Sequence, residues 1–201
     1  MLNKQVLIEG VPLDYQYPDL PTGCEATATS MLLRWAKIDA DKFAVADQLI
    51  KGDKVHEIDG KWYGANPDET FVGDPYSDEG SYGVFQKPIL RIIEHFLPEC
   101  SLDLSGRDFT EVLSVLDKGT PVVAWTTLKQ RETYYHKSWE DPLGQMIDWY
   151  NNEHAVTVVG YDQDFIIVHD PDTGKREFYD RDTFIHNWGS LGKRAVTLHV
   201  K

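Results

Sequence analysis

The sequence predicts an α+β fold in which N-terminal helices pack against a mostly antiparallel β-sheet. Four stretches in roughly the first 120 residues show the apolar spacing of helices. Later stretches are rich in β-branched and apolar residues and are joined mostly by short turns, as in antiparallel strands. Because the helices precede the strands instead of alternating with them, we expect the helices to cover one face of the sheet.

Each element has a local signal. The predicted helices lie within residues 24–35, 39–50, 84–97, 107–119 and 182–188. The predicted strands lie within residues 4–13, 121–128, 154–161, 164–170, 175–181 and 194–200. Asp39 or Asp41 is expected to cap the second helix, and Asp108 and Gly119 are expected to flank the fourth. Residues 52–82 and 129–153 show neither the hydrophobic period of a helix nor that of a strand, so we expect them to be irregular.

Length and composition limit the classes of protein. The chain has 201 residues, of which 41% are hydrophobic, which suits a single domain over residues 1–201 with a substantial core. Its net charge of −13 disfavours a nucleic-acid partner and weakly favours a basic or neutral substrate. No apolar stretch has the length of a membrane span, and the start "MLNKQVLIEG" lacks the features of a signal peptide. The compartment stays open, because an exported chain without its signal would read the same way.

Neither a metal nor another cofactor is expected. The two cysteines, Cys24 and Cys100, are too few and too far apart for a disulfide framework or a zinc site, although a single bridge between them is an alternative. The run "DPDTG" resembles the start of a calcium loop. Lys175 and Arg181 stand where such a loop needs Gly and Glu, so we reject that interpretation.

Cys24 is the first candidate for chemistry. It follows Gly23 in "LPTGCEATATSML", where a loop is expected to become a helix. Unpaired N–H groups and the positive end of the helix dipole would favour the thiolate there and lower the thiol pKa. Gly23 would let a substrate approach, and the Cys24 N–H would face a developing oxyanion. The alternative is a cysteine that acts only as a small buried hydrophobic residue.

A thiol nucleophile needs a base, and the base needs an orienting partner. His154 opens "HAVTVVGYDQDFIIVHD", which predicts a tight hairpin. If Asp162 is the centre of the turn, His154 and Asp170 lie opposite each other on one face. His154 capping a strand and Asp170 starting a turn are the alternatives. Gln16 could donate to the oxyanion, or could simply be a solvated loop residue.

These stretches resemble the papain-like cysteine peptidase superfamily, and within it the C39-like peptidase family of bacteria. "LPTGCEATATSMLL" resembles the nucleophile motif of that family, "HAVTVVGYDQDFIIVHDP" its base-and-acid hairpin, and "YQ" at residues 15–16 the upstream pair whose glutamine lines the oxyanion hole. "GTPVVAWT" resembles the strand between these blocks. Bacteriocin-processing members have Asp-Cys-Gly where this chain has Gly-Cys-Glu, so cleavage of double-glycine leaders is not implied.

The resemblance implies a papain-like fold and a cysteine peptidase that cleaves a peptide or amide bond through an acyl-enzyme. Cys24 would be the nucleophile, His154 the base and acid, Asp170 the orienting residue and Gln16 the oxyanion donor. The alternatives are an acyltransferase that passes the acyl group to an amine, and a non-catalytic peptide-binding module. Aromatic residues in 52–82 and 129–153 would either line the substrate cleft or hold these stretches against the core.

Overall fold

The computed structural model describes residues 5–199. The helices of this part are α1 (Cys24–Trp35), α2 (Lys42–Gln48), α3 (Gln86–Phe96), α4 (Phe109–Asp117), the 3₁₀ turn η1 (Leu128–Gln130) and α5 (Arg181–Ser190). The strands are β1 (Val6–Leu7), β2 (Lys51–Gly52), β3 (His56–Ile58), β4 (Lys61–Tyr63), β5 (Phe71–Val72), β6 (Ser101–Asp103), β7 (Val122–Thr127), β8 (Tyr135–Glu140), β9 (Met146–Tyr150), β10 (Glu153–Tyr161), β11 (Phe165–Asp170), β12 (Lys175–Asp180) and β13 (Ala195–Leu198). The predicted combination of helices with an antiparallel sheet is confirmed.

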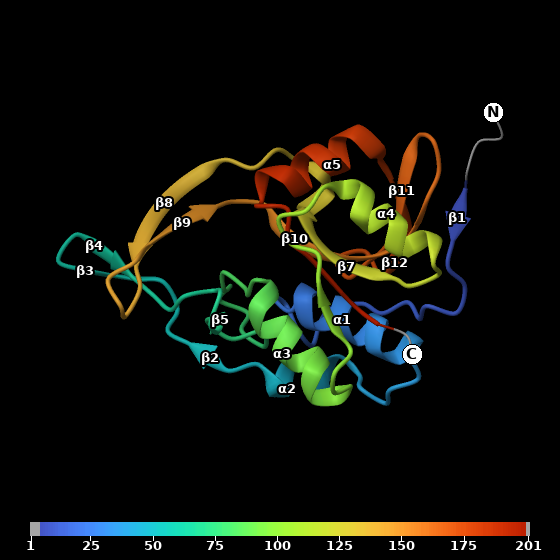
Figure 1. The fold of residues 1–201 in the computed structure, drawn as a ribbon. Helices are drawn as coiled ribbons and strands as arrows, with labels where there is room; N and C mark the ends of the chain where they lie inside the picture. Colours follow the sequence, from blue (N-terminus) through green and yellow to red (C-terminus); the bar gives the residue numbers. More distant parts are fainter. Residues whose placement is uncertain (1–4, 200–201) are drawn as a thin grey trace.

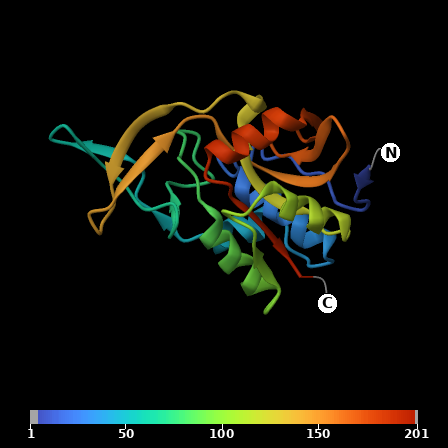
Figure 2. The ribbon, with the colours of Figure 1, turned by 45° about the horizontal axis from the view of Figure 1, so that its top comes forward.

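The main sheet has the strand order β12-β11-β10-β7-β13-β6, with β1 added on β10, and all of its pairings are antiparallel. α1 lies below this sheet with α2 and α3 beyond it, while α4 and α5 lie above it (Figure 1). The turned view shows the same arrangement (Figure 2). The expectation that helices cover only one face was therefore wrong. Every residue of β7 is buried, as in a strand covered on both faces.

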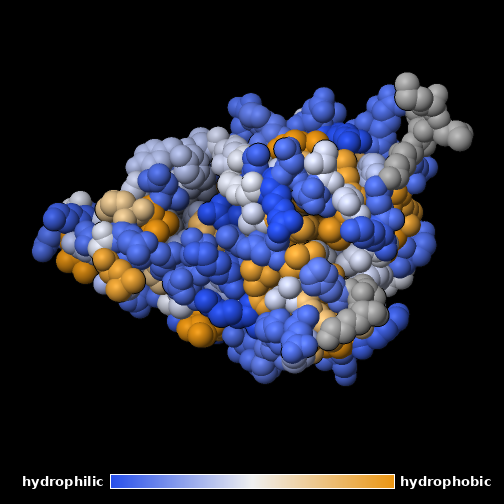
Figure 3. All heavy atoms as spheres, in the orientation of Figure 1, coloured by the Kyte–Doolittle hydropathy of each residue, from blue (hydrophilic) through white to orange (hydrophobic). Residues whose placement is uncertain are grey.

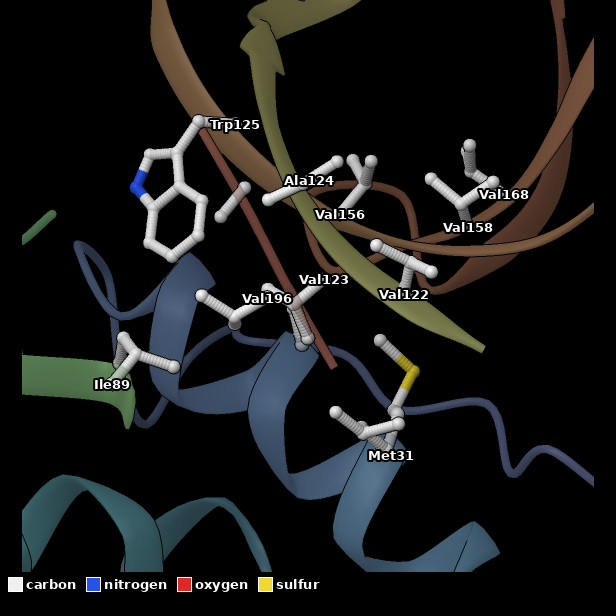
Figure 4. Packing of buried hydrophobic residues seen from close by; sticks show 14 of the residues in the cluster. Met31, Ile89, Val122, Val123, Ala124, Trp125, Val156, Val158, Val168 and Val196 are labelled. Carbon is white, nitrogen blue, oxygen red and sulfur yellow. The ribbon is translucent and has the colours of Figure 1, made fainter. Parts of the chain in front are cut away.

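α1 is the central helix, and it begins and ends at the predicted residues. Its residues from Cys24 to Leu33 are all buried, because it lies between the sheet and two other helices. Met31 points from α1 towards the strands that carry Val122 and Val158 (Figure 4). The Thr157 hydroxyl of β10 donates to the Ala28 carbonyl over 2.9 Å, which fixes α1 against the strand that begins beside His154.

The β10–β11 hairpin forms as predicted but in a different register. Thr157 pairs with His169, so His154 lies diagonally from Asp170 and not directly opposite it. The Asp162 carboxylate accepts hydrogen bonds from the N–H groups of residues 164 and 165, which places the turn further along the chain than predicted. A bulge between Val158 and Gly160 also shifts the pairing. Because side chains alternate with period two, a shift of two keeps His154 and Asp170 on one face.

The expectation that residues 52–82 and 129–153 are irregular was wrong in part. They contribute a four-stranded sheet of order β3-β4-β8-β9, which projects from the body of the molecule (Figures 1 and 2). β3 and β4 are joined by Asp59 and Gly60, both with positive φ, at 50° and 78°. An Asp-Gly dipeptide between two strands is a strong hairpin signal, and it can be found in the sequence without any hydrophobic period.

Aromatic residues hold this small sheet against the body. Trp139 is fully buried and donates from its indole nitrogen to the Ala65 carbonyl over 2.8 Å. Tyr82 packs edge-on against Trp139 and Trp149, with ring centroids 5.1 and 5.3 Å away. Apolar side chains also reach the surface on the small sheet (Figure 3), where Met146 is exposed. Tyr82, Trp139 and Trp149 therefore hold these stretches to the core, whereas Tyr134 and Tyr135 are exposed.

Candidate active site

Cys24 is the first residue of α1, and it is 8% exposed. Its thiol donates to the Glu25 Oε2 atom over 3.3 Å. Among the described residues its own N–H has no hydrogen-bond acceptor, as expected at the start of a helix. A Cβ at Gly23 would lie 2.8 Å from the Leu20 Cβ, so packing against Leu20 requires this glycine. Cys24 and Cys100 are both free, so the alternative of a bridge between them was wrong.

The electrostatics around the sulfur differ from expectation. Burial, then the charges of Glu25 and Glu153, raise the pKa of the Cys24 thiol well above its usual value. A hydrogen bond from the Ala155 N–H acts in the opposite direction but is outweighed. The expectation of a lowered thiol pKa was therefore wrong. The helix end is present, but a carboxyl group immediately beside the sulfur opposes it.

His154, Asp170 and Tyr179 form a hydrogen-bonded chain. His154 lies at the start of β10, is 3% exposed, and has its Nε2 atom 2.7 Å from Asp170 Oδ1. The other carboxylate oxygen of Asp170 accepts from the Tyr179 hydroxyl of β12, and the Asp172 N–H donates to Oδ1 over 2.7 Å. Burial alone would raise the pKa of Asp170, but His154 and these two donors together hold it below its usual value. The carboxylate is thus kept ionised beside the imidazole.

Gln16 is also buried in this region. Its side-chain Nε2 donates to the Pro21 carbonyl over 2.9 Å, and its backbone N–H donates to the Pro171 carbonyl over 3.0 Å. The amide oxygen Oε1 is shielded from solvent and has no hydrogen-bond partner among the described residues. An amide nitrogen carries two hydrogens, so Nε2 retains one donor beyond its bond to Pro21.

Three of the four predicted site residues line one cavity of about 140 Å³, namely Gln16, Cys24 and His154. Asp170 lies behind the imidazole and reaches the cavity only through it. The N-terminal loop, the start of α1 and the start of β10 therefore meet at this cavity, although up to 138 residues separate them in the chain. A second cavity of about 260 Å³ shares Ser81 and Tyr82 with the first and continues to Trp149. Tyr82 and Trp149 therefore line cavities, and a role of these cavities in binding substrate stays a prediction.

Two carboxyl groups of the cavity were not singled out from the sequence: Glu25 is fully buried, and Glu153 is half-buried with its Oε1 atom shielded from solvent. Glu25 and Glu153 both line the cavity, and each directly follows or precedes a predicted site residue. Burial raises the pKa of Glu25, against hydrogen bonds from the Val84 N–H and the Cys24 thiol. Burial and the neighbouring Glu25 raise the pKa of Glu153 well above its usual value, and Arg194 opposes this. Their adjacency to Cys24 and His154 was the signal that could have found them.

Within residues 5–199, no group of three or more His, Cys, Asp or Glu side chains is arranged to hold a metal ion. None of the helices in the same part of the chain is long and apolar enough to cross a membrane.

Comparisons with known proteins point to one family. The model of a family described as "Peptidase_C39 like family" matches residues 8–196. "Uncharacterized protein YvpB" of Bacillus subtilis (strain 168) is 31% identical over 201 residues, which cover 97% of this chain and 78% of that protein. A crystal structure described as a "putative C39-like peptidase" from Bacillus anthracis superposes with a TM-score of 0.88 at 30% identity, and the match covers 98% of both chains.

Proposed function

Because the chain belongs to the C39-like peptidase family, we propose that it is a cysteine peptidase or amide hydrolase that acts through Cys24, His154 and Asp170. We include in this proposal a papain-like fold and a single domain over residues 1–201. The observation that carries it is the 2.7 Å contact between His154 Nε2 and Asp170 Oδ1, with His154 lining the cavity that Cys24 also lines. Acyl transfer requires a nucleophile, a base and an orienting group, and the proposal gives these roles to Cys24, His154 and Asp170.

The first step forms the acyl-enzyme. Since Nε2 is held by Asp170, the Nδ1 atom of His154 is the one that takes the thiol proton as the sulfur attacks the carbonyl carbon. Because burial and the charges of Glu25 and Glu153 raise the thiol pKa, we propose that this proton transfer accompanies the attack. The new oxyanion accepts from the Cys24 N–H and from the second hydrogen of Gln16 Nε2.

The second half of the reaction restores the enzyme. The imidazolium of His154 gives its proton to the leaving nitrogen as the C–N bond breaks, and the amine departs. Water then attacks the thioester carbonyl, and His154 takes a proton from this water. The C–S bond breaks, the sulfur takes back a proton and the acid is released. Asp170 stays ionised throughout, because His154, Tyr179 and the Asp172 N–H hold its pKa down.

The test is a panel of fluorogenic peptides and acyl amines offered to the wild type, Cys24→Ala and Cys100→Ala. We expect turnover by the wild type and Cys100→Ala and none by Cys24→Ala, because Cys100 is the matched free, buried thiol outside the cavity. Turnover that survives in Cys24→Ala would overturn the proposal. Product that forms only when an amine is added would indicate the acyltransferase. Peptide binding to Cys24→Ala without any wild-type turnover would indicate a binding module.

A further inference from the structure

The charged side chains that line the cavity beside Cys24 are acidic. Glu25, Glu153 and Asp172 all contribute to its wall, and no Lys or Arg among the described residues does. A concave site lined by one sign of charge concentrates ligands of the opposite sign. The chain as a whole has a net charge of −13, which adds to this preference.

Two of these three carboxyl groups already have partners. Glu25 accepts the Val84 N–H over 2.7 Å with one oxygen and the Cys24 thiol with the other. Asp172 accepts from the Tyr17 hydroxyl over 3.3 Å. The carboxyl group of Glu153 differs, because its Oε1 atom is shielded from solvent and has no hydrogen-bond partner in the described part of the chain.

Arg194 is the cationic side chain whose charge acts on Glu153, but it does not supply the missing hydrogen bond to Glu153 Oε1. Its guanidinium group stacks on the Phe85 ring, 3.6 Å from the ring centroid, and donates to the Leu191 carbonyl. The Arg194 charge acts to lower the Glu153 pKa. Within residues 5–199, however, no ion pair within 4.0 Å joins the two side chains. A carboxyl group with an unpaired, shielded oxygen is unfavourable, and a ligand in the cavity that donates hydrogen bonds to this group, once the side chain turns towards it, would lower that cost.

We propose that Glu153 binds a cationic group, an ammonium or a guanidinium, on the substrate residue next to the bond that is cleaved. Glu153 immediately precedes His154 on β10, and its charge acts on the Cys24 sulfur, so it lies close to the reacting atoms. An ammonium or guanidinium supplies both the missing hydrogen bond and the opposite charge. This inference rests on the proposed peptidase function and names its substrate class as peptides with a basic residue beside the scissile bond.

The experiment compares pairs of peptides that differ only in charge. A peptide that the wild type cleaves is made with Lys, and separately with acetyl-lysine, at each position beside the cleaved bond. Acetylation removes the charge and keeps the aliphatic stem. For the wild type we expect kcat/KM to be about tenfold or more higher for the Lys peptide at one of these positions. For Glu153→Gln we expect this ratio to fall close to one.

Glu111→Gln is the matched control, because Glu111 is an exposed residue of the first turn of α4 and does not line the cavity. We expect it to keep the wild-type ratio. A wild type without charge preference would overturn the inference, and so would a preference that Glu153→Gln retains. Glu153→Asp keeps the charge, so it should retain part of the preference if Glu153→Gln loses it through charge and not through misfolding.

Binding separates this inference from the proposed function. Fluorescence anisotropy of labelled peptides measures binding to Cys24→Ala and to Cys24→Ala with Glu153→Gln, with no turnover needed. If the wild type cleaves nothing but Cys24→Ala binds Lys peptides about tenfold more tightly through Glu153, the peptidase proposal fails and the cation site stands. If Cys24 cleaves peptides but neither kcat/KM nor affinity depends on charge, the function stands and the cation site is overturned.

Discussion

The Glu25 carboxylate accepts a hydrogen bond of 2.7 Å from the Val84 N–H, which ties the first turn of α1 to the segment before α3. That segment follows Ser81 and Tyr82, which line the cavity beside Cys24. The other oxygen of the same carboxyl group accepts a hydrogen bond from the Cys24 thiol over 3.3 Å. One side chain therefore both positions a wall of the cavity and sets the charge beside the sulfur.

Replacing Glu25 by glutamine should make Cys24 more reactive towards alkylation near neutral pH. The Glu25 charge raises the thiol pKa, so a neutral amide of the same shape lowers that pKa and increases the thiolate fraction. The measurement is the rate of iodoacetamide labelling at Cys24 against pH, followed by peptide mapping, with Cys100 in the same molecule as the reference. If the pH at which the Cys24 labelling rate rises is the same in Glu25→Gln as in the wild type, or higher, the prediction is contradicted.

Gly83→Ala should destabilise the fold by about 2–3 kcal/mol. Gly83 has a φ of 118°, and a Cβ there would lie 2.3 Å from Glu25 Oε1. Gly80→Ala is the matched control, because Gly80 has a φ of 79° but nothing within 4 Å of its Cβ position. We expect the control to cost about 1 kcal/mol, from the backbone alone. If urea denaturation shows that Gly83→Ala and Gly80→Ala lose the same free energy of unfolding, the contact with Glu25 adds nothing.

Asp170→Asn should lower kcat by about 10²-fold or more while the fold is retained. The amide can no longer hold His154 Nε2 as the ionised carboxylate does, so the ring loses its preferred tautomer and the imidazolium loses its stabilising charge. Tyr179→Phe removes one hydrogen bond to the same carboxylate and should have a smaller effect, about tenfold or less. Steady-state kinetics on a common substrate checks both, and an unimpaired Asp170→Asn would remove Asp170 from the mechanism.

Glu153→Gln should stabilise the protein at pH 8 by roughly 1–2 kcal/mol and leave its stability almost unchanged near pH 4. The folded-state pKa of Glu153 is raised, so its contribution is complete below the unfolded pKa of about 4.3 and is lost as pH rises through the folded pKa. The amide cannot ionise and escapes this loss. Urea denaturation at the two pH values measures the difference. A variant that is less stable than the wild type at pH 8 would contradict the assignment.

Local signals predicted the central helix and six of the seven strands of the main sheet, all except β6. α1 was predicted at its observed bounds, and the Asp41 side chain caps α2 through the Ala44 N–H over 2.8 Å. The register of the β10–β11 hairpin was wrong, because the Asp162 side chain moves the turn and a bulge shifts the pairing. His154 and Asp170 still meet, since alternation keeps them on one face.

The small sheet and the placement of the acidic residues could not be predicted from local sequence signals. Periodicity did not reveal β3 and β4, because each has only three residues, and the β4–β8 pairing that completes the small sheet joins segments far apart in the chain. Glu25 and Glu153 read as ordinary surface charges until the fold places them in the cavity beside Cys24. Burial of the sulfur, and then the charges of Glu25 and Glu153, raise the thiol pKa, whereas the helix end alone argued for a lowered pKa.

The most direct measurement of the central claim is mass spectrometric mapping of the adduct formed by a peptide that carries a thiol-reactive electrophile at its carbonyl end. We predict one adduct, on Cys24, that is absent in Cys24→Ala and forms at least about tenfold more slowly in His154→Ala. An adduct on Cys100 instead, or labelling of Cys24 at an unchanged rate in His154→Ala, would contradict the account.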